Sequence, residues 1–252
     1  MAAIRVCVAG ITGWTGSAVA EAIQAAEDLE VVAGVARSDQ AQFSSVAEAL
    51  RAVQADVLVD YTHAAAVKEN VLAALERDVA VVVGPSGLTA EDYTEIDALA
   101  SEKGVAIIAA GNFSVSAALV LRFATEAARH LERWEVIDYA SATKPDAPSG
   151  TSRELAERVA EVRAPVLDVP VEKTHGAREG RGATVAGTQV HSLRLPSFTV
   201  STEVVFAGEG QRLSLRHDAG ESATPYVAGT LLAVRAAPSR AGLTRGLDRL
   251  LD

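Results

Sequence analysis

Short apolar runs alternate with helical patterns through the first part of the chain. Runs of strand length occupy residues 4–9, 30–36, 56–61, 79–84 and 105–110. Helical patterns lie at residues 17–26, 65–77 and 91–103. Near-continuous valine and isoleucine runs between helices are typical of a parallel sheet that is covered on both faces. The pattern therefore predicts a Rossmann-like α/β domain, in which ligands bind beyond the carboxyl ends of the strands.

The pattern of the chain changes from Val115 onward. Helices are predicted at 115–131 and 152–162, and strands at 134–139, 185–195, 199–207 and 211–217. β-Branched residues alternate with polar ones in the late strands, as expected for half-buried strands. We expect an α+β domain with a mixed sheet at residues 114–216. A last helix at 225–236 is expected to return to the first domain, which then comprises residues 1–113 and 217–252.

Composition limits the classes of partner. The chain has 252 residues, 49% of them apolar, and a formal net charge of −10. This charge disfavours nucleic acid and anionic membranes as partners, so a small anionic substrate must meet local positive groups. The single cysteine, Cys7, lies within the first strand and is expected to be a core residue without a disulfide. No signal peptide or apolar run of membrane-spanning length is recognised, and we expect a cytoplasmic location.

A glycine-rich turn, Gly10-Ile11-Thr12-Gly13-Trp14-Thr15-Gly16, follows the first strand and precedes the first helix. This is the context of a dinucleotide-binding fingerprint, although glycines also end strands for structural reasons alone. Gly10 permits the tight turn, Gly13 lets the backbone approach a pyrophosphate, and Gly16 lets the helix pack on the strand. The spacing is G-x-x-G-x-x-G instead of the commoner G-x-G-x-x-G. The predicted cofactor-binding residues of the turn are Gly10, Thr12, Gly13, Trp14, Thr15 and Gly16.

The end of the second strand indicates which cofactor is used. A site that prefers NAD usually carries a carboxylate there, which binds the ribose 2′-hydroxyl. Arg37 and Ser38 occupy this position, and a guanidinium beside a hydroxyl suits a 2′-phosphate. NADPH is therefore the predicted cofactor. Asp39 follows closely, so NADH stays an alternative, and a solvated arginine after a strand is the structural alternative.

Three further loops follow later strands of the first domain and are candidate walls for cofactor and substrate. They comprise residues 60–63, 84–87 and 111–114. The predicted cofactor-binding residues in and beside these loops are Tyr61, Thr62, Gly84, Ser86, Gly87, Ala110, Asn112 and Phe113.

The segment Lys144-Pro145-Asp146-Ala147-Pro148-Ser149-Gly150-Thr151 has the features of an anion-binding site. Ser149 can cap a helix that begins near Thr151, and the first turn of such a helix has unpaired N–H groups. A carboxylate placed there meets backbone donors, the positive end of the helix dipole and the Lys144 ammonium. An ordinary loop with a good helix cap is the structural alternative.

Together these segments resemble the dihydrodipicolinate reductase (4-hydroxy-tetrahydrodipicolinate reductase) family of lysine biosynthesis. The resemblance is carried by the glycine-rich turn, Asp-Tyr-Thr, a Gly-x-x-Gly loop, Asn-Phe-Ser, Lys-x-Asp-Ala-Pro-Ser-Gly-Thr and a late Phe-Ala-Gly-x-Gly-x-x-Leu run. It covers nearly the whole chain. It implies NAD(P)H reduction of a small anionic cyclic imine, the tetrahydrodipicolinate-forming step, by homotetramers built through the mixed sheet of a substrate-binding and oligomerisation domain.

The resemblance also assigns roles to individual residues. It implies that Lys144 binds substrate and is a candidate proton donor, which makes it the predicted catalytic residue. It implies that Gly150 and Thr151 bind a substrate carboxylate. The predicted substrate-binding residues are Ser141, Ser149, Gly150 and Thr151, and no metal site is predicted.

The chain departs from the family pattern just before this lysine. The family carries two adjacent histidines four and three positions before it, the first a general acid and the second a ligand for a substrate carboxylate. Ala140 and Ser141 occupy those places, and alanine can perform neither role, whereas serine can only hydrogen-bond. A basic residue usual in the family's late loop corresponds to Ser222. Tyr139 and His63 are alternative proton donors.

Three functional hypotheses follow from this departure. The chain is a lysine-pathway reductase with altered acid chemistry, a paralogue that reduces a different cyclic or conjugated imine, or a non-catalytic relative that keeps the cofactor pocket. The four other histidines are expected to be surface or structural residues. One of these, His175, lies in a glycine-rich loop that could fold over the site.

Overall fold

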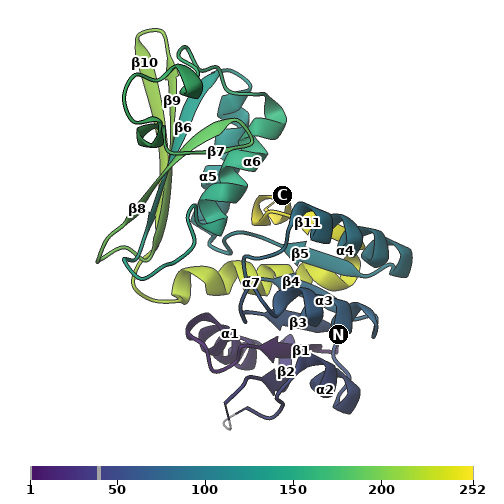
Figure 1. Cartoon of the computed structure of the whole chain (residues 1–252). Coiled ribbons are helices and arrows are strands. Elements are labelled where there is room, and N and C mark those ends of the chain that lie inside the picture. Colours follow the sequence, from purple (N-terminus) through teal and green to yellow (C-terminus); the bar gives the residue numbers. More distant parts are fainter. Residues whose placement is uncertain (1, 39–40, 252) are drawn as a thin grey trace. The chain divides into compact units, whose positions relative to one another are not determined.

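The computed structural model describes residues 2–38 and 41–251 (Figure 1). The chain divides into two compact units. Unit 1 consists of the residues up to Val115 and those from Ala223 onward, and unit 2 is Ser116–Ser222. Unit 1 is therefore discontinuous in sequence, and its second boundary lies beyond the predicted 216/217 because β10 (Gln211–Asp218) continues the sheet of unit 2.

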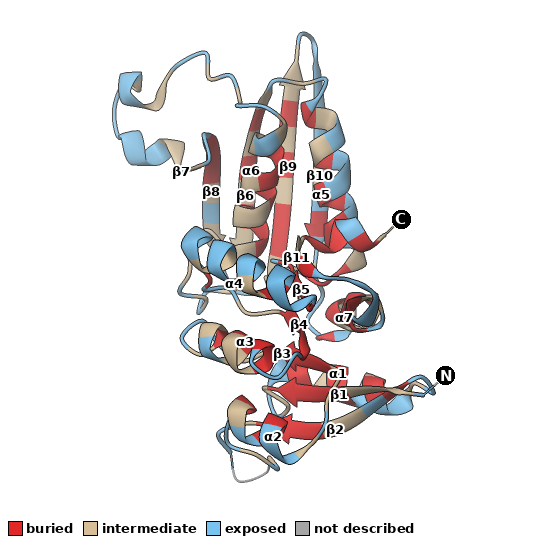
Figure 2. Cartoon of the chain, turned by 90° about the vertical axis from the view of Figure 1, so that its right-hand side faces the viewer, coloured by how far each residue is buried: buried red, intermediate tan, exposed pale blue. Residues whose placement is uncertain are grey.

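Unit 1 is built on a six-stranded parallel sheet in the order β11-β5-β4-β3-β1-β2. Its strands are β1 (Ile4–Ala9), β2 (Leu29–Val35), β3 (Val57–Asp60), β4 (Ala80–Val83), β5 (Ala106–Ala109) and β11 (Gly242–Arg245). β1 lies between β3 and β2, with Val8 opposite Val59 on one side and Gly34 on the other. Figure 2 shows the strands as mostly buried, which explains their continuous apolar sequences.

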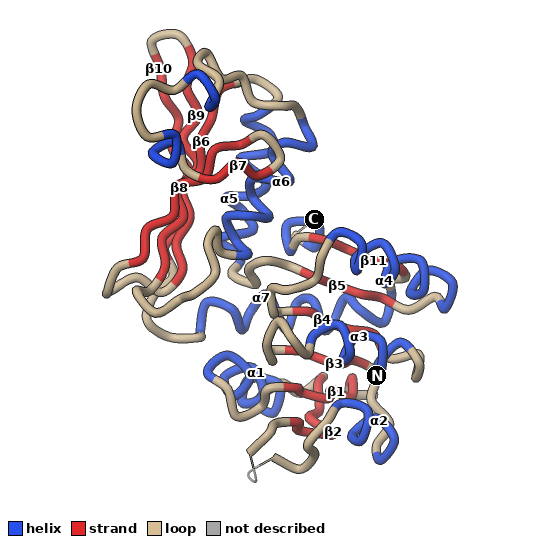
Figure 3. Tube along the Cα trace, viewed as in Figure 1, coloured by secondary structure: helices blue, strands red, loops and turns tan. Residues whose placement is uncertain are grey.

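Helices alternate with these strands along the chain (Figure 3). They are α1 (Trp14–Ala25), α2 (Val46–Ala52), α3 (Val67–Leu75), α4 (Ala90–Lys103) and α7 (Thr224–Ala236), followed by the 3-10 turns η3 (Ala237–Ser239) and η4 (Leu247–Leu250). Local sequence sets the ends of α4, because Thr89 and Asp92 form a capping box and Gly104 ends the helix in the left-handed conformation. The Rossmann-like arrangement predicted from sequence is confirmed.

Unit 2 contains a five-stranded mixed sheet in the order β10-β9-β6-β8-β7. Its elements are α5 (Val115–Ala128), β6 (Arg133–Ala140), α6 (Gly150–Val162), η1 (Val171–Lys173), η2 (Arg178–Arg181), β7 (Ala183–Val185), β8 (Thr188–Arg194), β9 (Val200–Gly208) and β10. β6 and β8 run parallel, and the other pairs are antiparallel. The mixed sheet predicted for the second domain is confirmed.

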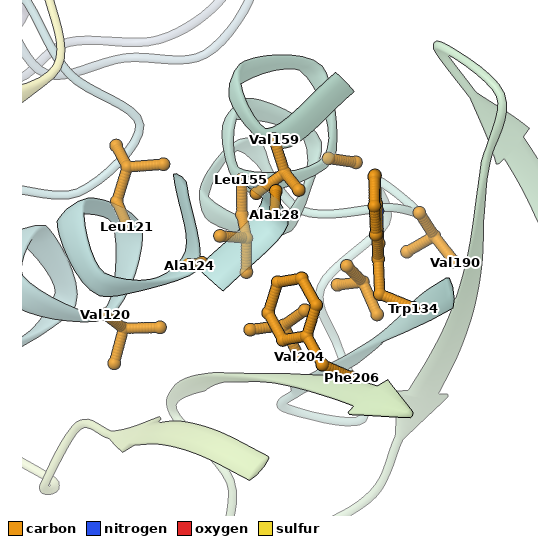
Figure 4. Packing of buried hydrophobic residues seen from close by; sticks show 12 residues of the cluster. Val120, Leu121, Ala124, Ala128, Trp134, Leu155, Val159, Val190, Val204 and Phe206 are labelled. Carbon is orange, nitrogen blue, oxygen red and sulfur yellow. The ribbon is translucent and has the colours of Figure 1, made fainter. Parts of the chain in front are cut away.

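The core of unit 2 lies between α5, α6 and one face of this sheet (Figure 4). Alternate residues of β6 are buried, among them Trp134 and Val136. The Trp134 ring lies 5.6 Å from the Phe206 ring, centroid to centroid. The Trp134 indole N–H donates to the Thr188 hydroxyl at 3.0 Å, so its one polar group is satisfied inside the core.

Several predicted boundaries are wrong in informative ways. The predicted strand 185–195 is a hairpin, β7 and β8, joined by Ala186 and Gly187, both of which have positive φ. Only Val185 of the predicted strand lies in β7, and Gly187, which interrupts the β-branched pattern, was an available signal of the turn. The helix expected from Ser17 begins at Trp14, inside the glycine-rich segment. α2 and β11 were not predicted, and β11, Gly-Leu-Thr-Arg, lacks the apolar run that marks the other strands of this sheet.

No helix of the described residues is long and apolar enough to cross a membrane. Within residues 2–38 and 41–251, no group of three or more histidine, cysteine, aspartate or glutamate side chains is placed to hold a metal ion.

His217 generates a prediction about acid stability. It lies on β10, is 4% exposed, and its Nδ1 is 3.0 Å from the Ser116 hydroxyl. Burial lowers its pKa below the ordinary value for histidine. The unfolded chain then binds this proton more readily, so stability is complete above about pH 6.5 and falls as the pH drops below it. We expect His217→Gln to lose less unfolding free energy between pH 7 and pH 5.5 than the parent chain.

Urea denaturation across this pH range measures the difference. His130→Gln is the matched control, because the His130 side chain is 73% exposed. Parallel pH profiles for the parent and His217→Gln would contradict the assignment.

Candidate active site

The glycine-rich turn after β1 is closed tightly on itself. Gly10 has φ of +81°, and its N–H donates to the Val35 carbonyl at 2.8 Å, which ties the turn to the end of β2. A Cβ on Gly10 would lie 2.5 Å from the Tyr61 carbonyl oxygen, and one on Gly16 would collide with the Gly10 carbonyl. Only glycine fits these two positions, because a side chain at either one would collide with main-chain atoms of the protein itself.

The helix that follows begins without a side-chain cap. Gly13 is the N-cap of α1 and offers no side chain, and the first turn contains no acidic residue. The N–H groups of that turn therefore lack a side-chain acceptor, which is the arrangement that binds a phosphate. Trp14, in this turn, is 52% exposed and lies edge-on to Tyr226, with ring centroids 5.9 Å apart.

Asp60 fixes the loop that follows β3. It is fully buried, and its carboxylate accepts hydrogen bonds from the Thr62 backbone N–H at 2.8 Å and the Thr62 hydroxyl at 2.6 Å. Asn70 donates to the other carboxylate oxygen at 2.9 Å. The Tyr61 hydroxyl is 2.6 Å from the Thr230 hydroxyl, and burial raises the Tyr61 pKa. These contacts hold the predicted residues Tyr61 and Thr62 in one conformation.

The loops after β4 and β5 complete this edge of the sheet. A Cβ at Gly84 would collide with the Tyr61 ring, so residues 61 and 84 are in direct contact. Ser86 and Gly87 are exposed. Ala110 and Phe113 are 7% and 2% exposed, so a ligand at this loop would meet its main chain more than these side chains. The Asn112 side-chain oxygen accepts from the Ser114 N–H at 2.8 Å.

Arg37 and Ser38 are exposed beyond the end of β2, as expected of residues that receive a cofactor phosphate. The Arg37 guanidinium contacts the imidazole of His63. Asp39, which left NADH as an alternative, lies outside the described residues.

In unit 2, one buried carboxylate organises the predicted anion-binding segment. Asp138 is 0% exposed, and its two oxygens accept hydrogen bonds from the Ser149 N–H at 3.0 Å and the Ser149 hydroxyl at 2.5 Å. The Ser152 and Ser192 hydroxyls donate to it at 3.1 Å and 3.0 Å. Arg194 donates at 2.9 Å and also contacts the Asp146 backbone carbonyl.

These contacts decide the charge state of Asp138. Burial raises its pKa, but the hydrogen bonds from Ser149, Arg194 and Ser192 outweigh burial, and the net pKa is lowered. The side chain is therefore a carboxylate at neutral pH. Sequence reasoning missed this residue, although an aspartate among the alternately buried positions of β6 was an available signal.

Ser149 has the predicted capping role, because its hydroxyl also accepts from the Ser152 N–H at 3.4 Å. The same hydroxyl donates to Asp138. The Ser149 hydroxyl therefore both donates and accepts a hydrogen bond within unit 2, and Ser149 is placed to hold the turn. Gly150 and Thr151, which follow it in the first turn of α6, stay predicted carboxylate ligands.

Lys144 lies at the other end of the segment. Its ammonium is 2.8 Å from Asp146 Oδ1, and its backbone N–H donates to the Ser141 carbonyl at 3.1 Å. The other carboxylate oxygen, Asp146 Oδ2, is buried without a hydrogen bond among the described residues. The segment thus places a primary ammonium beside a carboxylate that has spare hydrogen-bonding capacity.

The two positions where the sequence departs from the family pattern differ in setting. Ala140 ends β6 and is 0% exposed. Ser141 follows in the turn, with its hydroxyl 3.2 Å from that of Thr143. Tyr139 is not available as a substitute acid on this side, because its side chain points to the opposite face of the sheet. There its hydroxyl donates to Glu203 at 3.1 Å, and Arg216 lies over its ring.

Comparison with known proteins matches both units of the chain to one family. Family models described as "Dihydrodipicolinate reductase, N-terminus" and "Dihydrodipicolinate reductase, C-terminus" match residues 4–113 and 116–251. The chain belongs to the dihydrodipicolinate reductase family. It is 37% identical over 250 residues to the 4-hydroxy-tetrahydrodipicolinate reductase of Mycobacterium sp. (strain KMS), covering 99% of each chain. It is 38% identical over 251 residues to that of Cutibacterium acnes, covering 98% of each.

A solved dihydrodipicolinate reductase has the same fold. The dipicolinate-bound enzyme from Paenisporosarcina sp. TG-14 superposes with a TM-score of 0.80 at 28% identity, covering 99% of this chain and 100% of that one. GenD2 from gentamicin A biosynthesis, solved with NAD, shares the fold alone, with a TM-score of 0.68 at 16% identity. The predicted family, the α/β fold, and an oxidoreductase with a nicotinamide cofactor are confirmed.

The Asp138 cluster of this dihydrodipicolinate reductase family member yields a stability prediction. Asp138→Asn replaces one acceptor oxygen by a donor, which faces the donors of Ser149 or Arg194 and leaves a buried partner unsatisfied. Loss of one partner from a buried ion pair costs about 3 kcal/mol. We expect a fall of about that size in the free energy of unfolding, measured in urea at pH 7.

Asp28→Asn is the matched control, since Asp28 also pairs with an arginine, Arg235, but its side chain is 54% exposed. An exposed pair contributes about 1 kcal/mol or less. Equal effects of the two substitutions would show that Asp138 has no special role.

Proposed function

We propose that this chain reduces a cyclic imine with NAD(P)H, in the tetrahydrodipicolinate-forming step of the lysine and diaminopimelate pathway. One observation carries the proposal: the chain belongs to this reductase family over its whole length and keeps Lys144 and the Ser149-Gly150-Thr151 turn on a fixed scaffold. The relatives at 37% and 38% identity bear the name of this enzyme. A binding module without chemistry would have no need of the substrate anion site.

The glycine-rich turn fits the nicotinamide cofactor. Gly10 and Gly16 let the turn close on the protein's own main chain, and α1 begins without a side-chain cap. When bound, the cofactor supplies the hydride that adds to the electrophilic carbon of the substrate. Arg37 and Ser38 support NADPH as the cofactor, with NADH as the alternative. Use of this reduced cofactor also supports a cytoplasmic location, which cell fractionation would test.

In unit 2 the chain's own groups bind and orient the substrate. The first turn of α6 directs backbone donors at a carboxylate, and Asp138 keeps this turn in place through Ser149. The Lys144 ammonium adds positive charge and is the group that can donate a proton to the reduced product. Asp146 holds that ammonium at 2.8 Å, and Arg194 holds the Asp146 backbone.

The first test is the oxidation of NADPH at 340 nm with the lysine-pathway imine precursor. We expect turnover by the parent chain, and Lys144→Ala to lower kcat by about 10²- to 10⁴-fold, the range for a positioned acid. The dissociation constant of NADPH, measured by fluorescence, is expected to change less than about twofold. Lys173→Ala, in η1 of the same unit, is the control because Lys173 is exposed. A parallel loss of turnover and NADPH affinity would mean that Lys144 is structural.

A second candidate function is the reduction of a different cyclic imine, with one carboxylate, in a secondary pathway. The observation that favours it is the pair Ala140 and Ser141, which can supply neither an acid nor a cation for a second carboxylate. The same assay with a cyclic imine monocarboxylate, such as a pyrroline or piperideine carboxylate, separates the two. Faster turnover of the monocarboxylate favours the second candidate, and NADPH binding without any turnover favours a non-catalytic relative.

We also propose a homotetramer assembled through the outer face of the unit 2 sheet. This face holds an open pocket of about 710 Å³, lined by apolar side chains such as Ile137, Leu193 and Val205. Exposed apolar patches of this kind are typical of interfaces. Sedimentation velocity should give a mass near four times the 26.2 kDa chain, and Val205→Arg should lower it. A monomeric parent chain would overturn the proposal.

A further inference from the structure

The strand order of unit 1 brings two basic side chains together above the glycine-rich turn. β1 lies between β2 and β3 in the parallel sheet, so the loops after β2 and β3 flank the end of β1. Arg37 lies shortly after the end of β2 at Val35, and His63 shortly after the end of β3 at Asp60. The guanidinium and the imidazole are in contact, although the residues are far apart in the sequence.

The position of His63 is set by its own loop. Its carbonyl accepts from the Ala66 and Val67 N–H groups at 3.0 and 3.2 Å. The preceding residue, Thr62, is bound twice by the buried carboxylate of Asp60. The backbone of His63 is therefore anchored on both sides, whereas its imidazole is exposed. A side chain held in this way is suited to present a donor to a ligand.

Across residues 2–38 and 41–251, neither Arg37 nor His63 forms an ion pair with a carboxylate. The chain as a whole carries a net charge of −10, so an unneutralised basic pair is a local exception to its charge. A guanidinium and a neighbouring imidazole can both donate to a phosphate, the imidazole through a ring nitrogen that carries a proton.

We infer that His63 is a second ligand for the 2′-phosphate of NADPH, acting together with Arg37. The inference rests on the proposed function, because it requires NADPH as the cofactor. The neutral 2′-hydroxyl of NADH gains much less from two cationic or donor groups than a phosphate does. His63 is therefore a residue that determines cofactor specificity, rather than a replacement for the missing acid of the substrate site.

The nucleotide fragments 2′,5′-ADP and 5′-AMP test this inference without substrate or nicotinamide, because they differ only in the 2′-phosphate. We expect His63→Gln to weaken 2′,5′-ADP about five- to tenfold in calorimetric titrations and to change 5′-AMP less than about twofold, as for loss of one charge-assisted hydrogen bond. Arg37→Gln should weaken 2′,5′-ADP further. His63→Arg should keep the preference, and His130→Gln, an exposed histidine of unit 2, should change nothing.

Each outcome decides one question. If the parent chain binds 2′,5′-ADP no better than 5′-AMP, the use of NADPH in the proposed function fails, and the inference with it. If the parent discriminates but His63→Gln does so equally well, only the inference is overturned. Equal weakening of both fragments would mean that His63 only supports its loop. Unchanged fragment binding with a loss of kcat for both NADPH and NADH would identify His63 as a proton donor and also overturn the inference.

Discussion

The substrate side of this protein depends on a charge that has no access to water. Asp138 is wholly buried, and a carboxylate in that position is tolerated only when donors and an opposite charge replace its hydration. The donors come from β8, from the first turn of α6 and from the residue that caps that helix. Burying the Asp138 carboxylate without these donors would cost free energy, so the native fold brings β8 and the start of α6 together around it. The predicted anion-binding turn is fixed in place because its N–H and O–H donors bind the buried Asp138 carboxylate.

In unit 1 a buried carboxylate also fixes a loop that is predicted to bind the cofactor. Asp60 ends the buried strand β3, and its carboxylate accepts hydrogen bonds from Thr62 in the loop that follows. The two aspartates lie on different sheets; Asp60 fixes the loop that directly follows its strand, whereas Asp138 fixes the first turn of α6. Ligand-binding residues usually lie on loops, and such loops need support from the scaffold. In this chain the support is a buried strand carboxylate in both units.

Local sequence predicted the elements better than it predicted these connections. The apolar runs of unit 1 and the alternation of β6 indicated strands, since burial acts on each residue separately. The turn at Ala186 and Gly187 was missed although Gly187 interrupts the strand pattern there. The Arg37–His63 contact could not be predicted at all, because it depends on β2 and β3 lying on either side of β1. Spatial order of strands is a property of the whole fold and leaves no local signal.

The same reasoning explains how the site could change while the fold did not. None of the contacts of Asp138 involves the side chain of residue 140 or 141. Ala140 is the buried end of β6, and among the described residues the Ser141 hydroxyl bonds to the neighbouring Thr143 hydroxyl. Replacement of two histidines there leaves the capped turn, Lys144 and Asp146 supported as before. The predicted roles, binding of one carboxylate by the α6 turn and supply of an acid at position 140, fall on separate residues, so the second can be lost without disturbing the scaffold of the first.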